Sequence, residues 1–89
     1  MTSARYEVLV TRRFQKSFKT LDHETQSRIK KTLPSLASDP SLGKPLHGPL
    51  KLKRSLRVGK YRVVYEVDEK RKVVTLFGVG PRKGIYDNI

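Results

Sequence analysis

The stretch from residue 51 to residue 62, KLKRSLRVGKYR, constrains the fold more than any other part of the chain. Apolar and basic side chains alternate through much of it, which is typical of a strand with one buried face. Gly59 and Lys60 interrupt the alternation, and glycine at the first of two loop positions suits a primed hairpin turn. The stretch therefore predicts two antiparallel strands joined at Gly59 and Lys60.

The position of the turn determines which side chains face each other across this hairpin. A two-residue loop places Val58 opposite Tyr61 and Arg57 opposite Arg62. Leu56 then lies opposite Val63. Because side chains alternate between the faces of a strand, one face should be buried and the other basic. We expect the buried face to hold Leu52, Leu56, Val58, Tyr61, Val63 and Tyr65, and the basic face to hold Lys51, Lys53, Ser55, Arg57 and Arg62.

The basic face requires a partner, because cations placed side by side on a sheet repel each other. No acidic residue lies between residues 51 and 62, and the whole chain has 20 Lys and Arg against 8 Asp and Glu, a formal net charge of +12. Such a charge points first to nucleic acid, then to an anionic membrane and then to an acidic protein. A membrane is the less expected partner, because the sequence contains no spanning-length apolar run and no signal-like segment at its start.

Cysteine and histidine usage narrows the chemistry. The chain has no cysteine, so it has neither a disulfide framework nor a thiolate nucleophile, which fits a cytoplasmic protein. Its two histidines lie far apart in the sequence and lack the spacing of metal ligands. We therefore expect no metal site.

One strand and two helices precede the hairpin. Residues 5–10 are rich in side chains that favour strands. Thr11 can cap a helix that extends to about residue 21, and Asp22 can cap a second helix. Pro34 lies inside the second helical pattern and should kink or end that helix near Leu33.

The chain after the second helix predicts a loop and three strands. Residues 41–49 contain glycines and prolines and predict a loop that leads into the hairpin. The middle strand covers residues 62–67, a polar turn follows at 68–71, and the last strand covers 73–79. Residues 1–89 thus predict a single α+β domain with the order β-α-α-β-β-β, in which two N-terminal helices pack on one face of a curved antiparallel sheet.

Three motifs resemble the RelE/ParE toxin superfamily. SLRVGKYRVVYE at residues 55–66 is similar to its central signature, and PLHGPL at residues 45–50 is similar to the loop before it. GPRKGIY at residues 80–86 resembles the Arg-then-Tyr ending of the RNA-cleaving RelE branch. The resemblance covers nearly the whole chain and implies a RelE-like microbial RNase-type fold and a cytoplasmic toxin of a type II toxin–antitoxin pair. For the RelE branch it implies an endoribonuclease (mRNA interferase) that cleaves mRNA in the ribosomal A site, inhibits translation and needs no metal or cofactor.

Metal-free RNA cleavage must activate the 2′-hydroxyl, stabilise charge on the phosphorane and protonate the leaving 5′-oxygen. Arg57 and Arg62 could grip the scissile phosphate with their fork-shaped guanidinium groups. The resemblance gives the acid role to an arginine after the last strand, which Arg82 matches. It gives substrate orientation or stacking to a tyrosine beyond that arginine, which Tyr86 matches.

The proton acceptor is where the chain departs from the superfamily. RelE enzymes carry two lysines on the first hairpin strand, where this chain has Ser55 and Arg57, and a guanidinium group is a poor base. Lys53 shares the basic face and is the candidate base, since a lysine among other cations releases its proton more readily. We expect the surrounding cations Lys51, Arg54, Lys60 and Lys83 to bind RNA.

Other functions fit the same scaffold, and the superfamily also implies a partner. A ParE-like chain would inhibit DNA gyrase by binding the gyrase protein, and a non-catalytic homologue would only bind nucleic acid, which the missing lysine pair favours. The resemblance implies an acidic, partly disordered RelB-like antitoxin that covers or distorts the basic face. We expect a monomeric toxin when the chain is alone and a heterodimer or heterotetramer with the antitoxin.

Overall fold

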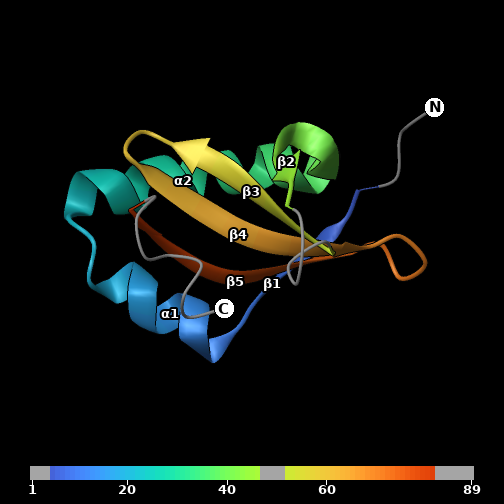
Figure 1. Cartoon of the computed structure of the whole chain (residues 1–89), viewed down its shortest axis with the longest axis horizontal. Coiled ribbons are helices and arrows are strands. Elements are labelled where there is room, and N and C mark those ends of the chain that lie inside the picture. Colours follow the sequence, from blue (N-terminus) through green and yellow to red (C-terminus); the bar gives the residue numbers. More distant parts are fainter. Residues whose placement is uncertain (1–4, 47–51, 82–89) are drawn as a thin grey trace.

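The computed structural model describes residues 5–46 and 52–81. Within these residues, two helices cover one face of a five-stranded sheet with the strand order β1-β5-β4-β3-β2 (Figure 1). The α+β class and the pair of N-terminal helices on one face are therefore confirmed. The elements are β1 (Glu7–Val10), α1 (Arg12–Lys19), α2 (His23–Ser38), the short 3-10 helix η1 (Pro40–Leu42), β2 (Lys44–Pro45), β3 (Lys53–Val58), β4 (Tyr61–Asp68) and β5 (Val73–Pro81).

The sheet is mixed, and this corrects the expectation of an antiparallel sheet. Strands β2 to β5 pair antiparallel, but β1 pairs parallel with β5, with Glu7 opposite Val73. A parallel pair needs a long crossover connection, and the segment that includes both helices and the hairpin supplies one. The residues of β1 identify a strand, but they do not identify its partner, which lies more than 60 residues further along the chain.

Both predicted helix caps are present, and the second helix does not end at its proline. The Thr11 hydroxyl accepts a hydrogen bond from the Phe14 N–H at 3.1 Å, and the Asp22 carboxylate accepts one from the Thr25 N–H at 3.2 Å. Helix α2 continues through Pro34, so the prediction that the helix ends there is wrong. Pro34 has no N–H to donate to the Lys30 carbonyl. Both residues are exposed, so water can donate to that carbonyl instead.

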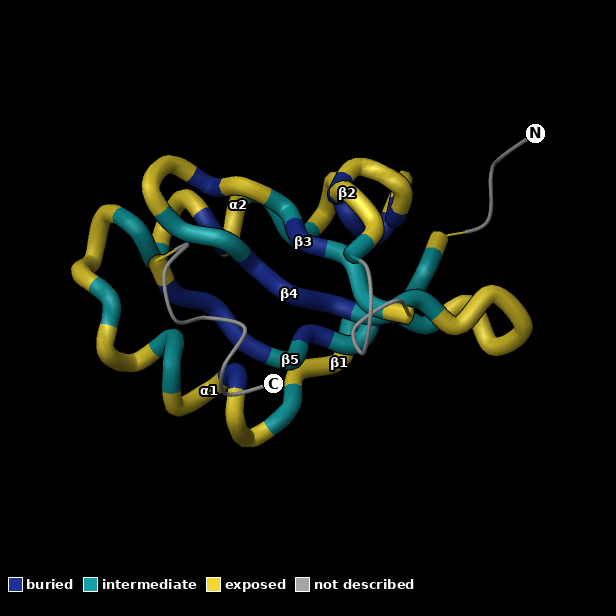
Figure 2. The backbone as a smooth tube through the Cα atoms, in the orientation of Figure 1, coloured by how far each residue is buried: buried dark blue, intermediate teal, exposed yellow. Residues whose placement is uncertain are grey.

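The core lies between the helices and the sheet (Figure 2). The predicted apolar face of the hairpin contributes to it, with one exception: Leu52 is 73% exposed, because it precedes β3 and lies beyond the strand ladder. The buried core residues are Phe14 from α1, Ile29 and Leu36 from α2, Val58 from β3, Val63 and Tyr65 from β4, and Val74, Leu76 and Val79 from β5.

Part of the predicted loop forms regular structure, namely η1 and β2, and Tyr65 holds this part in place. The Tyr65 hydroxyl donates to the Pro40 carbonyl at 2.5 Å and accepts from the Gly43 N–H at 2.9 Å. Burial raises the pKa of this hydroxyl, which keeps it protonated as a donor. A Cβ atom at Gly43 would lie 2.6 Å from the Tyr65 hydroxyl oxygen, so only glycine fits there. These contacts fix η1 and β2 against the hairpin.

Candidate nucleic-acid interface

The outer face is the side of β3 and β4 that points away from the helices, and it carries the predicted cations. The turn between the strands has Gly59 at φ 62°, while Lys60 has no positive φ, which matches a II′ hairpin turn. As predicted, Arg57 lies opposite Arg62 and Val58 opposite Tyr61. The outer face is defined by three cross-strand pairs, Arg57 with Arg62, Ser55 with Val64, and Lys53 with Glu66.

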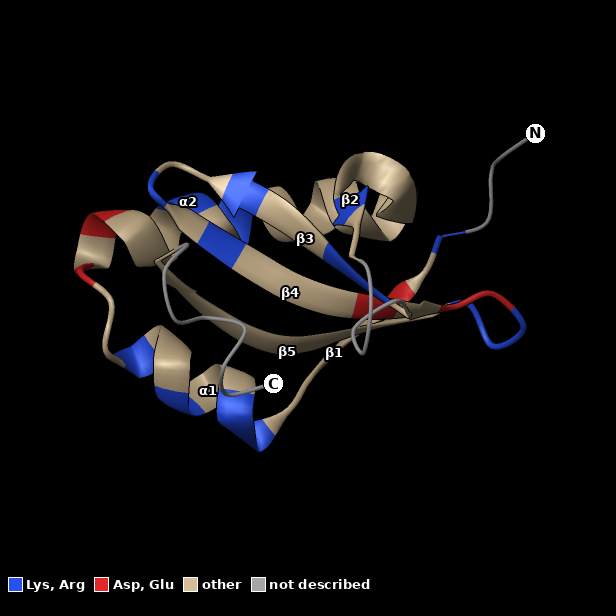
Figure 3. Ribbon diagram, in the orientation of Figure 1, with Lys and Arg blue, Asp and Glu red and all other residues tan. Residues whose placement is uncertain are grey.

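The arginine pair occupies the hairpin end of the outer face (Figure 3). In a two-residue hairpin the residues next to the turn exchange hydrogen bonds, so Arg57 and Arg62 form the following non-hydrogen-bonded pair, in which side chains approach most closely. The Arg57 Nε–H donates to the Gly59 carbonyl at 3.2 Å, which leaves the terminal nitrogens of this exposed group able to bind another molecule. Neither arginine takes part in an ion pair formed within the described residues. Two adjacent guanidinium groups form a natural site for a phosphate.

The middle of the outer face is buried. Ser55 is 3% exposed, Val64 is 0% exposed, and Gly78 of β5 lies opposite Val64. A bulge follows between Val64 and Tyr65, and it leaves Phe77 as an additional residue of β5. These buried residues therefore separate the arginine pair at one end of the outer face from Lys53 and Glu66 at the other.

Lys53 lies at the other end of the outer face, in an environment that the sequence analysis missed. Its ammonium group is 3.8 Å from the Glu66 carboxylate and 4.5 Å from the centre of the Phe77 ring. Lys53 therefore lies beside a carboxylate and an aromatic ring, and the expectation that it sits only among cations is wrong. The alternation that places Arg62 on the outer face also places Glu66 there, and this signal could have identified the carboxylate.

The distance along β4 separates Lys53 from the arginine pair. Glu66, the partner of Lys53, is four residues from Arg62, which corresponds to about 13 Å along a strand. The structure therefore places Lys53 and the arginine pair at opposite ends of the outer face.

Arg54 does not join the outer face. It lies opposite the core residue Tyr65, and its guanidinium group donates to the Gly43 carbonyl at 2.7 Å. This contact holds Gly43, which precedes β2, and the binding of RNA by Arg54 stays a prediction. Strict alternation along β3 puts Arg54 on the same face as Leu56, so the sequence already contained this signal.

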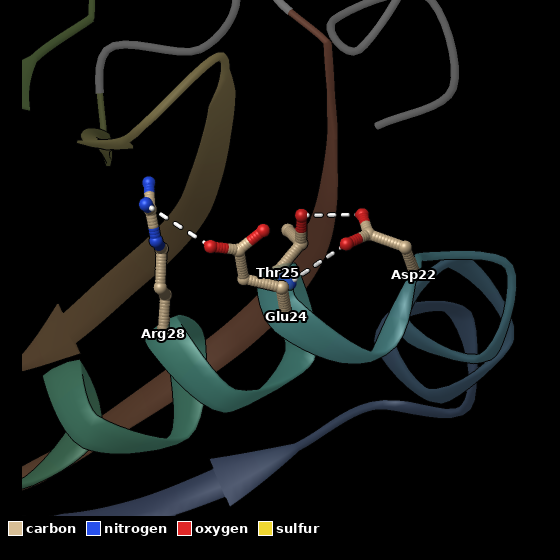
Figure 4. A network of polar contacts seen from close by, with 4 residues as sticks. All are labelled: Asp22, Glu24, Thr25 and Arg28. Atoms are coloured by element: carbon tan, nitrogen blue, oxygen red, sulfur yellow. Dashed lines mark hydrogen bonds and ion pairs between the residues drawn. The ribbon is translucent and has the colours of Figure 1, made fainter.

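Lys60 lies in the hairpin turn, beside the start of α2. It lines a hollow of about 310 Å³ together with Asp22, Glu24 and Arg28. Figure 4 shows the two acidic side chains bound within α2: Glu24 contacts Arg28 at 3.4 Å, and Asp22 accepts from Thr25. Lys60 is therefore exposed close to carboxylates as well as to the arginine pair.

The remaining predicted site residues, Lys51, Arg82, Lys83 and Tyr86, lie outside the described residues. Strand β5 ends at Pro81, which is opposite Tyr61. Strand β5 therefore ends at the same end of the sheet as the arginine pair. Within residues 5–46 and 52–81, no three His, Asp or Glu side chains gather as metal ligands would, and neither helix is long and apolar enough to cross a membrane.

The sequence of this chain matches the model of a known protein family. A family model described as the ParE toxin of the type II toxin–antitoxin system parDE matches residues 8–86. The chain belongs to this family. As a member of the ParE family it falls within the RelE/ParE superfamily that the three motifs resemble, and it is a toxin of the type II class. A search of curated proteins found no match.

Solved structures share the fold of this ParE-family chain. The toxin–antitoxin complex RelBE2 from Mycobacterium tuberculosis matches with 25% identity and a TM-score of 0.84, over 91% of this chain and 95% of the other. The intact Escherichia coli RelBE complex matches with 26% identity and a TM-score of 0.73, over 88% and 98% of the two chains. A YoeB/ParE toxin from Agrobacterium tumefaciens matches in fold at 18% identity, with a TM-score of 0.73 over 85% and 98%.

Proposed function

We propose that this toxin is a metal-independent endoribonuclease that cleaves mRNA in the ribosomal A site and so inhibits translation. The observation that supports the proposal is the direct pairing of Arg57 with Arg62 on the outer face, without an ion pair to the described residues. Two guanidinium forks there match the charge and the geometry of a phosphodiester, and they match the greater charge of its phosphorane better still.

The proposed reaction breaks the bond between phosphorus and the 5′-oxygen and forms a bond from the 2′-oxygen to phosphorus. Arg57 and Arg62 stabilise the phosphorane, Arg82 supplies the proton to the leaving 5′-oxygen, and Tyr86 orients or stacks on the substrate. Because Lys53 lies about 13 Å along the strand from the arginine pair, we assign it to RNA binding, and the 2′-hydroxyl proton passes to solvent. The site then works chiefly through electrostatic stabilisation.

Ribosomes programmed with a defined mRNA test the proposal. The wild-type toxin should cut the message at the A-site codon, and Arg57→Ala or Arg62→Ala should slow cleavage by about 10²–10³-fold, the usual effect of losing one donor to a developing negative charge. Arg82→Ala should also abolish most of the activity. Arg71→Ala is the matched control, since Arg71 lies in the β4–β5 turn, 4.0 Å from Asp68. An intact message with wild-type toxin would overturn the proposal.

Inhibition of DNA gyrase is the second candidate, because the family model that matches this chain is that of ParE toxins. This function requires no RNA cleavage and tolerates Tyr86→Phe. Purified gyrase and supercoiled DNA, incubated with the toxin, separate the two candidates. Gyrase-dependent DNA cleavage together with an intact message would replace the nuclease with a gyrase inhibitor, while neither product would indicate a non-catalytic nucleic-acid-binding homologue.

We propose further that the partner in the cell is an acidic RelB-like antitoxin. The net charge of +12 supports such a partner, and structural neighbours were solved as complexes of RelE-type toxins with RelB antitoxins. Co-expression of the toxin with the neighbouring reading frame should restore growth and yield a heterodimer or heterotetramer in light scattering, whereas the toxin alone should be monomeric. A toxin that is harmless without any partner would contradict this proposal.

A further inference from the structure

Helix α1 carries a second basic surface, here named the α1 stripe and defined by Arg12, Arg13, Lys16 and Lys19. All four side chains are exposed, and the helix contains no acidic residue. Arg12, Lys16 and Lys19 lie four, three and seven positions apart and share one side of the helix, and Arg13, three positions before Lys16, borders that side. Phe14 and Phe18 point the other way, toward the core.

Only part of the charge of the α1 stripe serves the stability of the helix, through Lys16 and Lys19 in the last turn, where cations complement the helix dipole. Like charges three or four residues apart destabilise a helix, and cations in the first turn oppose the helix dipole, as Arg12 and Arg13 do. None of the four side chains takes part in the ion pairs formed within residues 5–46 and 52–81. By contrast, Arg71 and Lys72 of the β4–β5 turn lie near Asp68 and Glu69. The α1 stripe is therefore an uncompensated cationic surface.

The α1 stripe is separate from the outer face. Helix α1 packs on β5 from the core side of the sheet, through Phe14, so its exposed side cannot face the same way as Arg57 and Arg62. Figure 3 shows its blue segments at a different edge of the molecule from those of β3 and β4. A shallow hollow of about 590 Å³ on the helix is lined by Arg12, Arg13, Lys16 and Ser17. The Ser17 hydroxyl donates to the Arg13 carbonyl at 2.7 Å, so it leaves the cations to define the chemistry of the hollow.

The chemistry of the stripe favours phosphates over a protein partner. It holds guanidinium and ammonium groups and no exposed large apolar side chain, whereas protein interfaces usually have an apolar centre. The two aromatic side chains of α1, Phe14 and Phe18, pack toward the core, so the stripe offers no ring on which the bases of a single strand could stack. Its cations therefore suit the phosphate backbone of a double helix, which is bound through charge.

We propose that the α1 stripe binds the phosphate backbone of double-helical RNA, while the outer face acts on the single-stranded message. The inference rests on the proposed nuclease function, because folded ribosomal RNA would then be the duplex that anchors the toxin beside its substrate. It adds a binding surface that contributes affinity and does not contribute to the chemical step.

Binding of the full chain to a labelled RNA hairpin and to purified ribosomes, between about 50 and 200 mM salt, tests the inference. The variant Arg12→Gln/Arg13→Gln/Lys16→Gln should bind the hairpin at least about tenfold more weakly. Its slope of log affinity against log salt should be smaller in magnitude by about 2–3, the amount expected for the loss of three phosphate contacts. Lys44→Gln/Lys70→Gln/Arg71→Gln is the matched control, because it removes the same charge from other exposed positions and should keep the wild-type slope.

Two further measurements separate this inference from the proposed nuclease function. Arg57→Ala/Arg62→Ala should lose cleavage, while its hairpin binding should weaken less than that of the α1 variant. If wild-type toxin cleaves no message but the α1 variant still loses hairpin binding, the nuclease is wrong and the α1 inference stands. Lys16→Gln alone, with circular dichroism to confirm helix content, should give one third of the change in slope. Wild-type hairpin binding by the α1 variant, or an equal loss in the control variant, would overturn the inference.

Discussion

At the scale of single residues, Tyr65 connects the core to the segment that leads into the hairpin. Its ring is fully buried among core side chains, and its hydroxyl bridges the Pro40 carbonyl and the Gly43 N–H. Arg54 adds a bond to the Gly43 carbonyl from the same face of the sheet. One tyrosine and one arginine thus hold the polypeptide beside the outer face without contributing to that face.

We expect Tyr65→Phe to lower the free energy of unfolding by about 1–3 kcal/mol, because it leaves the Gly43 N–H and the Pro40 carbonyl buried without their partner. Urea denaturation followed by circular dichroism measures this change. Tyr6→Phe is the control, since the Tyr6 hydroxyl is exposed and donates to Glu69 at the surface, and its loss should change stability little. Equal stability of Tyr65→Phe and wild type would show that water replaces the hydroxyl.

At the scale of elements, the start of α2 depends on Asp22. The Thr25 hydroxyl and the Thr25 N–H both donate to its carboxylate, and they lower the pKa of Asp22 below its ordinary value. Arg28, one turn further along α2, lies against the hairpin turn, with a terminal nitrogen 3.3 Å from the position of a Cβ on Gly59. The start of α2 and the hairpin turn are therefore neighbours.

The lowered pKa predicts how the stability of this cap depends on pH. A carboxyl group with a lower pKa in the folded state stabilises the fold at pH values above its unfolded pKa of about 3.9, and this contribution is lost as the pH falls through the folded value. The melting temperature of Asp22→Asn should therefore be lower than that of wild type at pH 6, and the difference should shrink by about pH 2. The amide of this variant would still accept a hydrogen bond but would not titrate. A difference that is constant with pH would contradict the role of the charged form.

At the scale of the whole molecule, the distribution of charge dominates. Cations lie on the outer face, on α1 and in the β4–β5 turn, and the acidic side chains are few and local (Figure 3). A net charge of +12 on a chain of 89 residues destabilises the compact state through self-repulsion. The same charge attracts the polyanions that both proposed surfaces bind.

We expect the melting temperature of the toxin to rise with added sodium chloride, because screening weakens this repulsion. Polyphosphate at the same ionic strength should raise it further, since an anion that binds the folded state at two surfaces stabilises that state by mass action. Differential scanning calorimetry measures both effects. A melting temperature that does not change with either addition would show that the cations are too far apart to interact.

The local features of this protein follow from its sequence alone. Helix caps and tight turns depend on residues within a few positions of each other, as at Thr11, Asp22 and Gly59. Their patterns can therefore be recognised in the sequence without knowledge of the fold. The turn then fixes the Arg57–Arg62 pairing. The alternation of side chains along each strand also determines the faces on which Arg54 and Glu66 lie. The motifs identified the superfamily, although they did not decide between a ribosomal and a gyrase target.

Only the tertiary structure decided the features that depend on contacts between distant segments. These are the parallel pairing of β1 with β5, the passage of α2 through Pro34, the exposure of Leu52, and the bulge that brings Phe77 beneath the Lys53 ammonium. The physical reason is that strand partners and side-chain environments are selected by packing energy summed over the whole core. A pattern within one segment records which face is buried, but it does not record which segment buries it.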